Sequence, residues 1–191
     1  MTIPLEIIDL SKTYDTKEAV RNISFKVNEN EIIGILGPNG CGKTTTIGMI
    51  LGLLKPTKGK VLINGIEIEK QRVDLLNELN FISPYIELPK KLTVRQNLEV
   101  FGRLYDVKEL GIKIDYLSEK LRLNEFINKI TGELSSGQKN RVSLAKSIIN
   151  DPSVLLLDEP TASLDPETGD FVRSFLEEYQ REKKTSILLA S

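Results

Sequence analysis

The chain has 191 residues, of which 40% are hydrophobic and 28% are charged, as expected for a globular domain that can bury a core. Its formal net charge is −1, so no overall basic field indicates a nucleic-acid partner. A single cysteine excludes an internal disulfide, and the lack of histidine excludes the usual zinc sites.

The sequence shows no targeting or membrane-spanning pattern. The first residues lack the basic and then apolar segments of a signal peptide. No apolar run approaches the roughly 18–20 residues that span a bilayer. We therefore expect a cytoplasmic chain that reaches a membrane only through partners.

Two short strands are expected near the beginning of the chain. Apolar residues partly alternate over 5–10 and 19–27, and the polar turn Asp15–Glu18 separates these stretches. Tyr14 lies in the connection, and by position alone it covers apolar surface as readily as it contacts a ligand.

The strongest motif is the glycine-rich loop Gly37–Thr44, which follows the apolar run 32–36 and precedes a helical pattern. This context fits the phosphate-binding pattern G-x-x-x-x-G-K-[ST]. Glycines let backbone N–H groups surround phosphate oxygens, and the helix N-terminus adds partial positive charge. A tight strand-to-helix turn would explain the glycines but not Lys43 and Thr44. We therefore predict a nucleotide phosphate site.

Roles within this loop follow from side-chain chemistry. Lys43 can reach the β and γ phosphates, and the Thr44 hydroxyl can bind Mg²⁺. No chemical role is expected for the Cys41 thiol. The residues predicted to contact ATP here are Gly37, Pro38, Asn39, Gly40, Cys41, Gly42, Lys43, Thr44 and Thr45.

The next part of the chain changes from strands to helices. Asn64-Gly65 predicts a β-hairpin over 60–68, and with it an antiparallel side sheet. A helix is expected over 72–79 and a short strand at 81–82. Beyond Ser83, three helical patterns follow: one opened by a capping box at Thr93 and Gln96, one near 115–123 and one near 125–130.

This alternation predicts an α/β fold. The nucleotide-binding core is expected to contain 1–82 and 134–191, with a mainly parallel sheet and the antiparallel β side sheet. Residues 83–133 are expected to form an inserted helical subdomain.

A second capping box, Ser135-x-x-Gln138, predicts a helix that runs to Asn150. A helix start that carries a glycine and a free serine hydroxyl is also an anion site. One ATP cannot easily use two such sites in one small domain. We therefore hypothesise that this site meets a phosphate bound by another copy.

The run 154–157 followed by Asp158 and Glu159 predicts a buried parallel strand with two acids at its carboxyl end, where ligands bind in open α/β sheets. Asp158 is placed to hold Mg²⁺, and Glu159 to orient or deprotonate an attacking water. The alternative is a surface turn with two solvated acids. An amphipathic helix through Phe171 and Tyr179 and a strand over 185–191 are expected to follow.

Together these motifs resemble the ATP-binding domain of ABC transporters, over essentially the whole chain. Gly37–Thr44 resembles the Walker A loop of the P-loop NTPases, and Val154–Glu159 resembles the Walker B strand with its catalytic glutamate. Leu134–Gln138 is similar to the LSGGQ signature, with Ser136 where glycine is usual, and Ser163–Asp165 matches the D-loop. Tyr14 falls where the family places an aromatic that stacks on adenine.

The resemblance implies an ATPase that drives transport through transmembrane partner subunits. Two ATP-binding domains, as a homodimer or heterodimer, would close head to tail around ATP and pull on the membrane subunits through the helical subdomain. Lys43 and Glu159 would be catalytic, and Thr44 and Asp158 would bind Mg²⁺. Ser135, Gly137 and Gln138 would contact ATP in trans. Such a subunit would lie at the inner face of the cell membrane, held by its partners.

Two departures from the family pattern stand out. Pro84 occupies the position of the usual Q-loop glutamine and has no side-chain donor or acceptor, which predicts slow hydrolysis. The sequence ends at Ser191, about where the family's switch histidine would follow. We interpret this as a C-terminal truncation.

Two alternatives remain open at this point. One is a soluble ABC-type ATPase linked to DNA or ribosomes. The DNA-linked kind would carry a long coiled coil and the ribosome-linked kind a second such domain, and neither is seen in this sequence. The other is a module that dimerises on ATP with little turnover.

Overall fold

The computed structural model describes residues 3–83, 87–161 and 164–191. The chain forms two compact units. The first contains the residues up to Phe81 together with Ser153–Glu159 and Tyr179–Ser191, and the second contains Ile82–Pro152 and Pro160–Glu178. Pro84 and Ser163, which the family resemblance singled out, lie outside the described residues.

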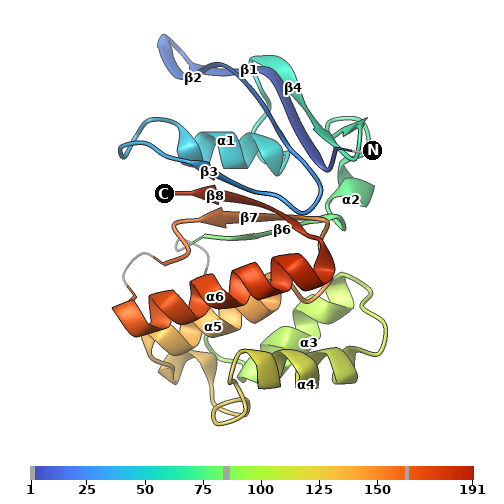
Figure 1. Cartoon of the computed structure of the whole chain (residues 1–191), viewed down its shortest axis with the longest axis vertical. Coiled ribbons are helices and arrows are strands. Elements are labelled where there is room, and N and C mark those ends of the chain that lie inside the picture. Colours follow the sequence, from blue (N-terminus) through green and yellow to red (C-terminus); the bar gives the residue numbers. More distant parts are fainter. Residues whose placement is uncertain (1–2, 84–86, 162–163) are drawn as a thin grey trace. The chain divides into compact units, whose positions relative to one another are not determined.

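The first unit contains a sheet with the strand order β3-β8-β7-β6 (Figure 1). Strand β8 pairs in parallel with both β3 and β7. All residues of β7 are buried, as its continuous apolar run predicts for a central parallel strand. The expected buried strand that ends at Asp158 is therefore confirmed. The four strands are Ile32–Ile35 (β3), Leu79–Ile82 (β6), Val154–Asp158 (β7) and Ser186–Ala190 (β8).

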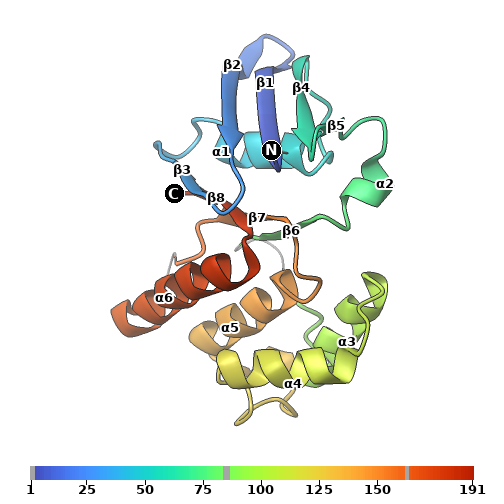
Figure 2. The same cartoon turned by 45° about the vertical axis from the view of Figure 1, so that its right-hand side comes forward.

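An antiparallel sheet with the order β2-β1-β4-β5 forms the other β layer of this unit (Figure 2). The predicted hairpin joins β4 and β5, and both of its turn residues have positive φ, 49° at Asn64 and 79° at Gly65. A two-residue turn of this kind matches the twist of the flanking strands. The strands are Leu5–Tyr14 (β1), Lys17–Val27 (β2), Lys58–Ile63 (β4) and Ile66–Glu67 (β5).

Helix α1, Lys43–Ile50, lies between these two sheets (Figure 1). Its apolar residues join one buried cluster with both sheets, which fixes the helix against the end of β3. Burial of this kind stabilises by about 25 cal/mol per Å² of apolar surface removed from water. The buried residues shared by the helix and the sheets include Ile7, Val27, Met49, Ile50, Ile63, Val154, Leu156 and Leu188.

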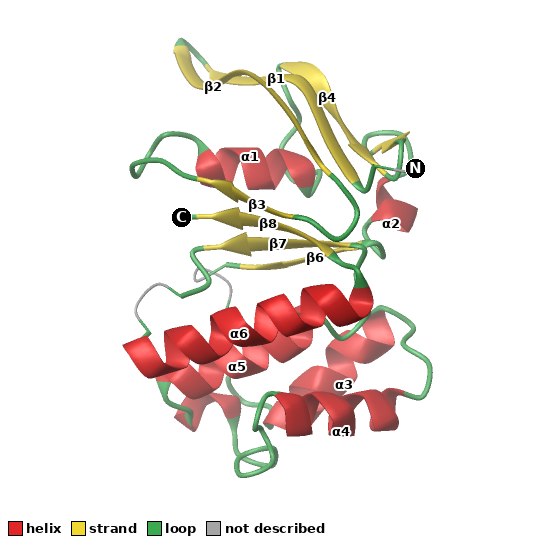
Figure 3. Ribbon diagram, in the orientation of Figure 1, coloured by secondary structure: helices red, strands yellow, loops and turns green. Residues whose placement is uncertain are grey.

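The second unit is mainly helical (Figure 3). Thr93 caps α3 and Ser135 caps α5, and both predicted capping boxes are present. The residues of α6 up to Glu178 belong to this unit. Its helices are Val94–Leu104 (α3), Leu110–Lys120 (α4), the 3₁₀ turn Thr131–Glu133 (η1), Ser136–Ser147 (α5) and Pro166–Lys183 (α6).

The helix expected over 72–79 is much shorter. Helix α2 covers only Arg72–Leu75, and Leu79 begins strand β6 instead. The carbonyl of Glu78 accepts a hydrogen bond from the N–H of Val154 at the start of β7. Pairing with a buried strand therefore outweighs the local helical preference.

The helical pattern near 125–130 is also wrong as a helix prediction, because this stretch forms turns. The carbonyl oxygens of Ile127 and Lys129 accept hydrogen bonds from the N–H groups of Arg95 and Val94. Those donors belong to the first turn of α3 and have no partner inside their own helix. Phe126 and Ile127 of this stretch are buried, while the carbonyls of the stretch cap the neighbouring helix.

Smaller differences concern element ends. Tyr14 is the last residue of β1 and not part of the connection. Helix α4 begins earlier than expected, and α5 ends at Ser147, three residues before the predicted stop. In the part of the chain that the structure describes, none of the helices combines the length and the apolar character needed to cross a bilayer.

Candidate nucleotide site

The glycine-rich loop joins β3 to α1 in the first unit, and its glycines adopt conformations that other residues rarely take. The φ angles of Gly40 and Gly42 are 82° and 101°. A Cβ atom at Gly42 would lie 2.4 Å from the carbonyl oxygen of Ala19, so only glycine fits there. Gly42 also precedes the first turn of α1, which contains no acidic residue. The first N–H groups of the helix therefore face a position suited to an anion.

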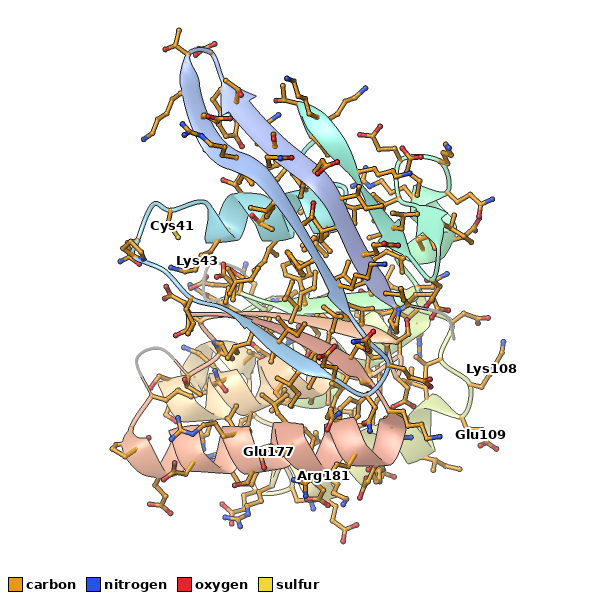
Figure 4. All side chains as sticks on the ribbon, turned by 45° about the horizontal axis from the view of Figure 1, so that its top comes forward. Cys41, Lys43, Lys108, Glu109, Glu177 and Arg181 are labelled. Carbon is orange, nitrogen blue, oxygen red and sulfur yellow. The ribbon has the colours of Figure 1, made fainter. Side chains whose placement is uncertain are left out.

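Lys43 is buried, with only 7% of its surface exposed. Its ammonium donates hydrogen bonds to the carbonyl oxygens of Gly37 at 2.6 Å and Pro38 at 3.3 Å. The side chain therefore lies along the loop, as Figure 4 shows beside the exposed Cys41. Two neutral carbonyl oxygens hold this buried ammonium, and a phosphate oxygen would be a charged acceptor in their place.

Thr44 and Asp158 come from distant parts of the sequence and meet at the end of β7. The hydroxyl of Thr44 donates to Oδ2 of Asp158 at 3.3 Å. The pKa of Asp158 is raised, and burial is the largest cause. The nearby charge of Glu159 also raises this pKa, whereas the hydrogen bond from Thr44 and the charge of Lys43 lower it. A buried carboxylate whose pKa is raised by burial gains from a nearby cation.

These two side chains supply oxygen donors of the kind that Mg²⁺ prefers. Among the residues that the structure describes, no group of three or more His, Cys, Asp or Glu side chains could hold a metal by itself. Mg²⁺ usually takes one or two protein ligands and completes its shell with water and substrate phosphates. The donor set therefore fits Mg²⁺ bound together with a nucleotide.

Glu159 follows the last residue of β7 and is half-buried. Its φ is 48°, in the left-handed region that a glutamate seldom adopts. Its N–H donates to the carbonyl oxygen of Ala190 in β8 at 2.9 Å. The sheet thus holds the backbone of the second acid in a strained conformation next to Asp158.

Tyr14 ends strand β1, and the residue is 44% exposed. The ammonium of Lys12 lies 5.1 Å from the centre of this ring and donates to the carbonyl oxygen of Lys55 at 2.7 Å. The contact with Lys12 orients the aromatic ring. The exposed area of the ring is available for stacking.

The second predicted anion site, at the start of α5, lies in the second unit. The Ser135 hydroxyl oxygen accepts from the N–H of Gln138 at 3.2 Å, and Oε1 of Gln138 accepts from the N–H of Ser135 at 3.0 Å. The predicted free hydroxyl of Ser135 is therefore partly engaged, because its oxygen already caps the helix. Its proton and the N–H of Gly137 can still be donated to an anion.

Sequence reasoning missed two residues that contact the predicted site residues or their neighbours. Lys12 precedes Tyr14 by two positions, but the predicted strand ended before both residues, so its period of two did not indicate their contact. Asn140 contacts Pro160, the residue after Glu159, and no sequence signal indicated that contact.

Comparison with known proteins finds related sequences and structures. A family model described as "ABC transporter" matches residues 20–162. The chain is 34% identical to the ABC transporter ATP-binding protein NatA of Bacillus subtilis, covering 98% of this chain and 78% of that protein. It is 36% identical to the Nod factor export ATP-binding protein I of Rhizobium etli, covering 96% of this chain and 59% of that protein.

Solved structures show the same similarity. The structure of cbiO1 from Clostridium perfringens, described as part of the ABC transporter complex cbiONQ, matches with a TM-score of 0.88 at 30% identity. The match covers 100% of this chain and 79% of that chain. The predicted α/β fold, with a parallel sheet and an antiparallel sheet, is therefore confirmed.

Proposed function

Since this chain belongs to the ABC transporter family, whose ATP-binding members couple ATP hydrolysis to transport, we propose that it is the ATP-hydrolysing subunit of such a transporter. ATP-binding subunits of this family work with transmembrane subunits. The observation that best supports the proposal is the contact between Thr44 and Asp158. It brings the phosphate loop to the strand that carries the catalytic acid.

ATP binding uses the residues of the first unit. The N–H groups of the loop Gly37–Thr44 and the start of α1 surround the β and γ phosphates. Lys43 exchanges its loop carbonyls for phosphate oxygens. The exposed ring of Tyr14 stacks on the adenine, a contact worth about 1–3 kcal/mol.

Thr44 and Asp158 would hold Mg²⁺, which neutralises charge that develops on the phosphates. Glu159 then orients a water and accepts its proton as the water oxygen bonds to the γ-phosphorus. The bond from this phosphorus to the oxygen that bridges the β and γ phosphates breaks. ADP and phosphate are the products.

A second copy, or a related ATP-binding chain, completes the site in the proposed mechanism. The start of α5 in that chain contacts the γ-phosphate through Ser135, Gly137 and Gln138. The inserted helical segment 83–133 transmits closure of the dimer to the membrane subunits. The chain would thus work at the inner face of the cell membrane, held there by its partner subunits.

ATP-dependent association tests this proposal. Analytical ultracentrifugation of the Glu159→Gln variant, which should not consume ATP, is expected to show dimers with ATP and Mg²⁺ and monomers with ADP. The Ser135→Asp change provides a specific disruption, because aspartate caps a helix as well as serine but repels a phosphate. We expect this change to abolish the dimer while the monomer still binds ATP.

Ser135→Thr is the matched control and should keep the ATP-dependent dimer. Monomers under all nucleotide conditions would contradict the head-to-tail arrangement. Unchanged dimerisation in the Ser135→Asp variant would show that α5 does not meet the phosphate.

A further inference from the structure

The chain that leads into Ser135 is held against the segment before α3 by a ladder of backbone hydrogen bonds. The N–H of Gly132 donates to the carbonyl oxygen of Lys90 at 3.0 Å. The N–H of Thr131 donates to the carbonyl oxygen of Leu92 at 2.9 Å. All of these residues belong to the second unit, as does Ser135. The turn before α5 therefore has a fixed place within this unit.

A buried side chain near the start of α3 strengthens this ladder. Asn97 is fully buried, and its Nδ2 donates to Oγ1 of Thr131 at 2.8 Å. The same nitrogen lies within hydrogen-bond distance of the carbonyl oxygens of Pro89, at 3.1 Å, and Thr93, at 3.2 Å. Thr131 is only 2% exposed. Because a buried polar group is costly to leave without a partner, the contact between Asn97 and Thr131 resists local opening.

Thr131 lies close along the chain to the groups that are proposed to contact the γ-phosphate. Its carbonyl oxygen accepts a hydrogen bond from the N–H of Leu134 at 3.4 Å, and Leu134 directly precedes the N-cap Ser135. After the cap, Gly137 packs on α6 of the same unit, since a Cβ atom there would lie 3.4 Å from Oγ1 of Thr168. The start of α5 is thus held by the ladder before Ser135 and by α6 after it.

We propose that Thr131, held by Asn97, is a positioning residue for the contact with ATP in trans. It fixes the turn before α5, so that the Ser135 hydroxyl and the N–H of Gly137 are in place before the γ-phosphate of the other chain arrives. Donors that are already ordered lose less entropy on binding, which strengthens the dimer without a further contact. This inference rests on the proposed function, and neither Thr131 nor Asn97 touches the nucleotide in it.

The test compares Thr131→Val with Thr131→Ser in the full chain. Valine keeps the branched shape and removes the hydroxyl, while Nδ2 of Asn97 keeps its carbonyl partners at Pro89 and Thr93. Serine keeps the hydroxyl. Hydrogen–deuterium exchange of the monomer measures opening at the start of α5. Sedimentation with ATP and Mg²⁺, in the Glu159→Gln background, gives the Kd of the dimer, and a fluorescent ATP analogue gives the affinity of the monomer.

We expect Thr131→Val to speed amide exchange over residues 134–139 by about tenfold and to raise the dimer Kd by about tenfold. The affinity of the monomer for the analogue should change less than about twofold, because the phosphate loop belongs to the first unit. Thr131→Ser should restore both values. A residue that matters only for folding would lower the thermal midpoint and leave the dimer Kd, measured well below that midpoint, unchanged. Wild-type exchange or a wild-type dimer Kd in Thr131→Val would overturn the inference.

If Thr131→Val did not fold, Gly132→Ala would test the same ladder. A Cβ atom at Gly132 would lie 3.0 Å from the carbonyl oxygen of Lys90 and would push the two segments apart. Gly111 in α4 has no neighbour within 4 Å of such an atom, so Gly111→Ala is the matched control in the same unit. Gly132→Ala should raise the dimer Kd by about tenfold and Gly111→Ala should leave it unchanged. A wild-type dimer Kd in Gly132→Ala would reject the positioning role.

Failure of the proposed function would look different, because the Glu159→Gln protein itself would then remain monomeric with ATP and Mg²⁺. The exchange rates of the monomer would still decide whether Thr131 holds the start of α5. Faster exchange in Thr131→Val together with a monomeric Glu159→Gln protein would reject the trans contact itself. Unchanged exchange would reject the hold that Thr131 exerts on α5.

Discussion

The hydroxyl of Thr44 lies 3.3 Å from Oδ2 of Asp158, which connects the first turn of α1 to the last residue of β7. Both elements belong to the first unit, so one folded body carries the predicted phosphate loop and the strand that ends in Asp158. The proposed Mg²⁺ site depends on this contact. Removing either oxygen should therefore change the metal dependence more than the fold.

Thr44→Val keeps the side-chain shape and removes the oxygen. We expect ATP hydrolysis to require at least about tenfold more Mg²⁺, since even residues behind a metal ligand commonly matter by that factor. Thr44→Ser keeps the hydroxyl and should restore the wild-type dependence. Activity measured across a MgCl₂ titration checks this, and superimposable curves for wild type and Thr44→Val would contradict it.

Three glycine-to-alanine changes separate backbone strain from crowding. Gly34 has neither a positive φ nor a neighbour within 4 Å, whereas Gly40 has a φ of 82° and open space. Gly42 combines a φ of 101° with a carbonyl oxygen 2.4 Å from the added Cβ. We expect Gly34→Ala to leave the free energy of unfolding nearly unchanged. Gly40→Ala should lower it by about 1 kcal/mol, and Gly42→Ala should lower it by about 2–4 kcal/mol. Thermal melts give the ranking, and an equal effect at Gly34 and Gly42 would refute the steric explanation.

Tyr14 offers a test of adenine recognition. Tyr14→Ala should weaken ATP binding by about 5- to 150-fold, which corresponds to about 1–3 kcal/mol of stacking. Tyr14→Phe keeps the ring and should bind ATP within twofold of wild type. Isothermal titration calorimetry with both variants distinguishes stacking from a purely structural role. Equal affinities for all three proteins would remove Tyr14 from the site.

Lys146 on α5 should make stability depend on pH. Burial lowers its pKa to about 8, and its ammonium lies 5.2 Å from the centre of the Phe101 ring. The unfolded pKa is about 10.4, so between these values the unfolded chain binds more protons and stability rises with pH. Below about pH 8 both states are protonated and the contribution is flat.

The comparison is between wild type and Lys146→Met. The free energy of unfolding of wild type, relative to the variant, should increase by up to about 3 kcal/mol between pH 8 and 10.5. Urea unfolding at both pH values measures it. A constant difference across this range would mean that Lys146 keeps its proton when folded.

Much of the fold was predictable because local patterns and tertiary structure agree. The alternation around Asn64-Gly65, the apolar run before Asp158 and the two capping boxes each allow few conformations. The failures occurred where a tertiary contact outweighed a local preference. Leu79 joins a sheet, and the turns around Ile127 give their carbonyls to the start of α3.

The candidate site divides in the same way. The phosphate-binding pattern consists of consecutive residues, so the sequence alone was sufficient to predict Lys43 and Thr44 as site residues. The positive φ of Glu159 and the amide of Asn140 on the carbonyl of Pro160 depend on segments about twenty residues apart. Such contacts have no spacing rule, and only the structure could identify them.

In the proposed function, this chain hydrolyses ATP with Glu159 as the base, despite a proline at the usual Q-loop position. Steady-state phosphate release from wild type and Glu159→Gln, with ATP affinity measured in parallel, tests it most directly. We predict a fall in kcat of at least about a hundredfold in the variant, at the upper part of the range for a general base, with affinity unchanged. Equal and negligible turnover in both proteins, with ATP still bound, would contradict the enzyme assignment and favour an ATP-gated dimerisation module.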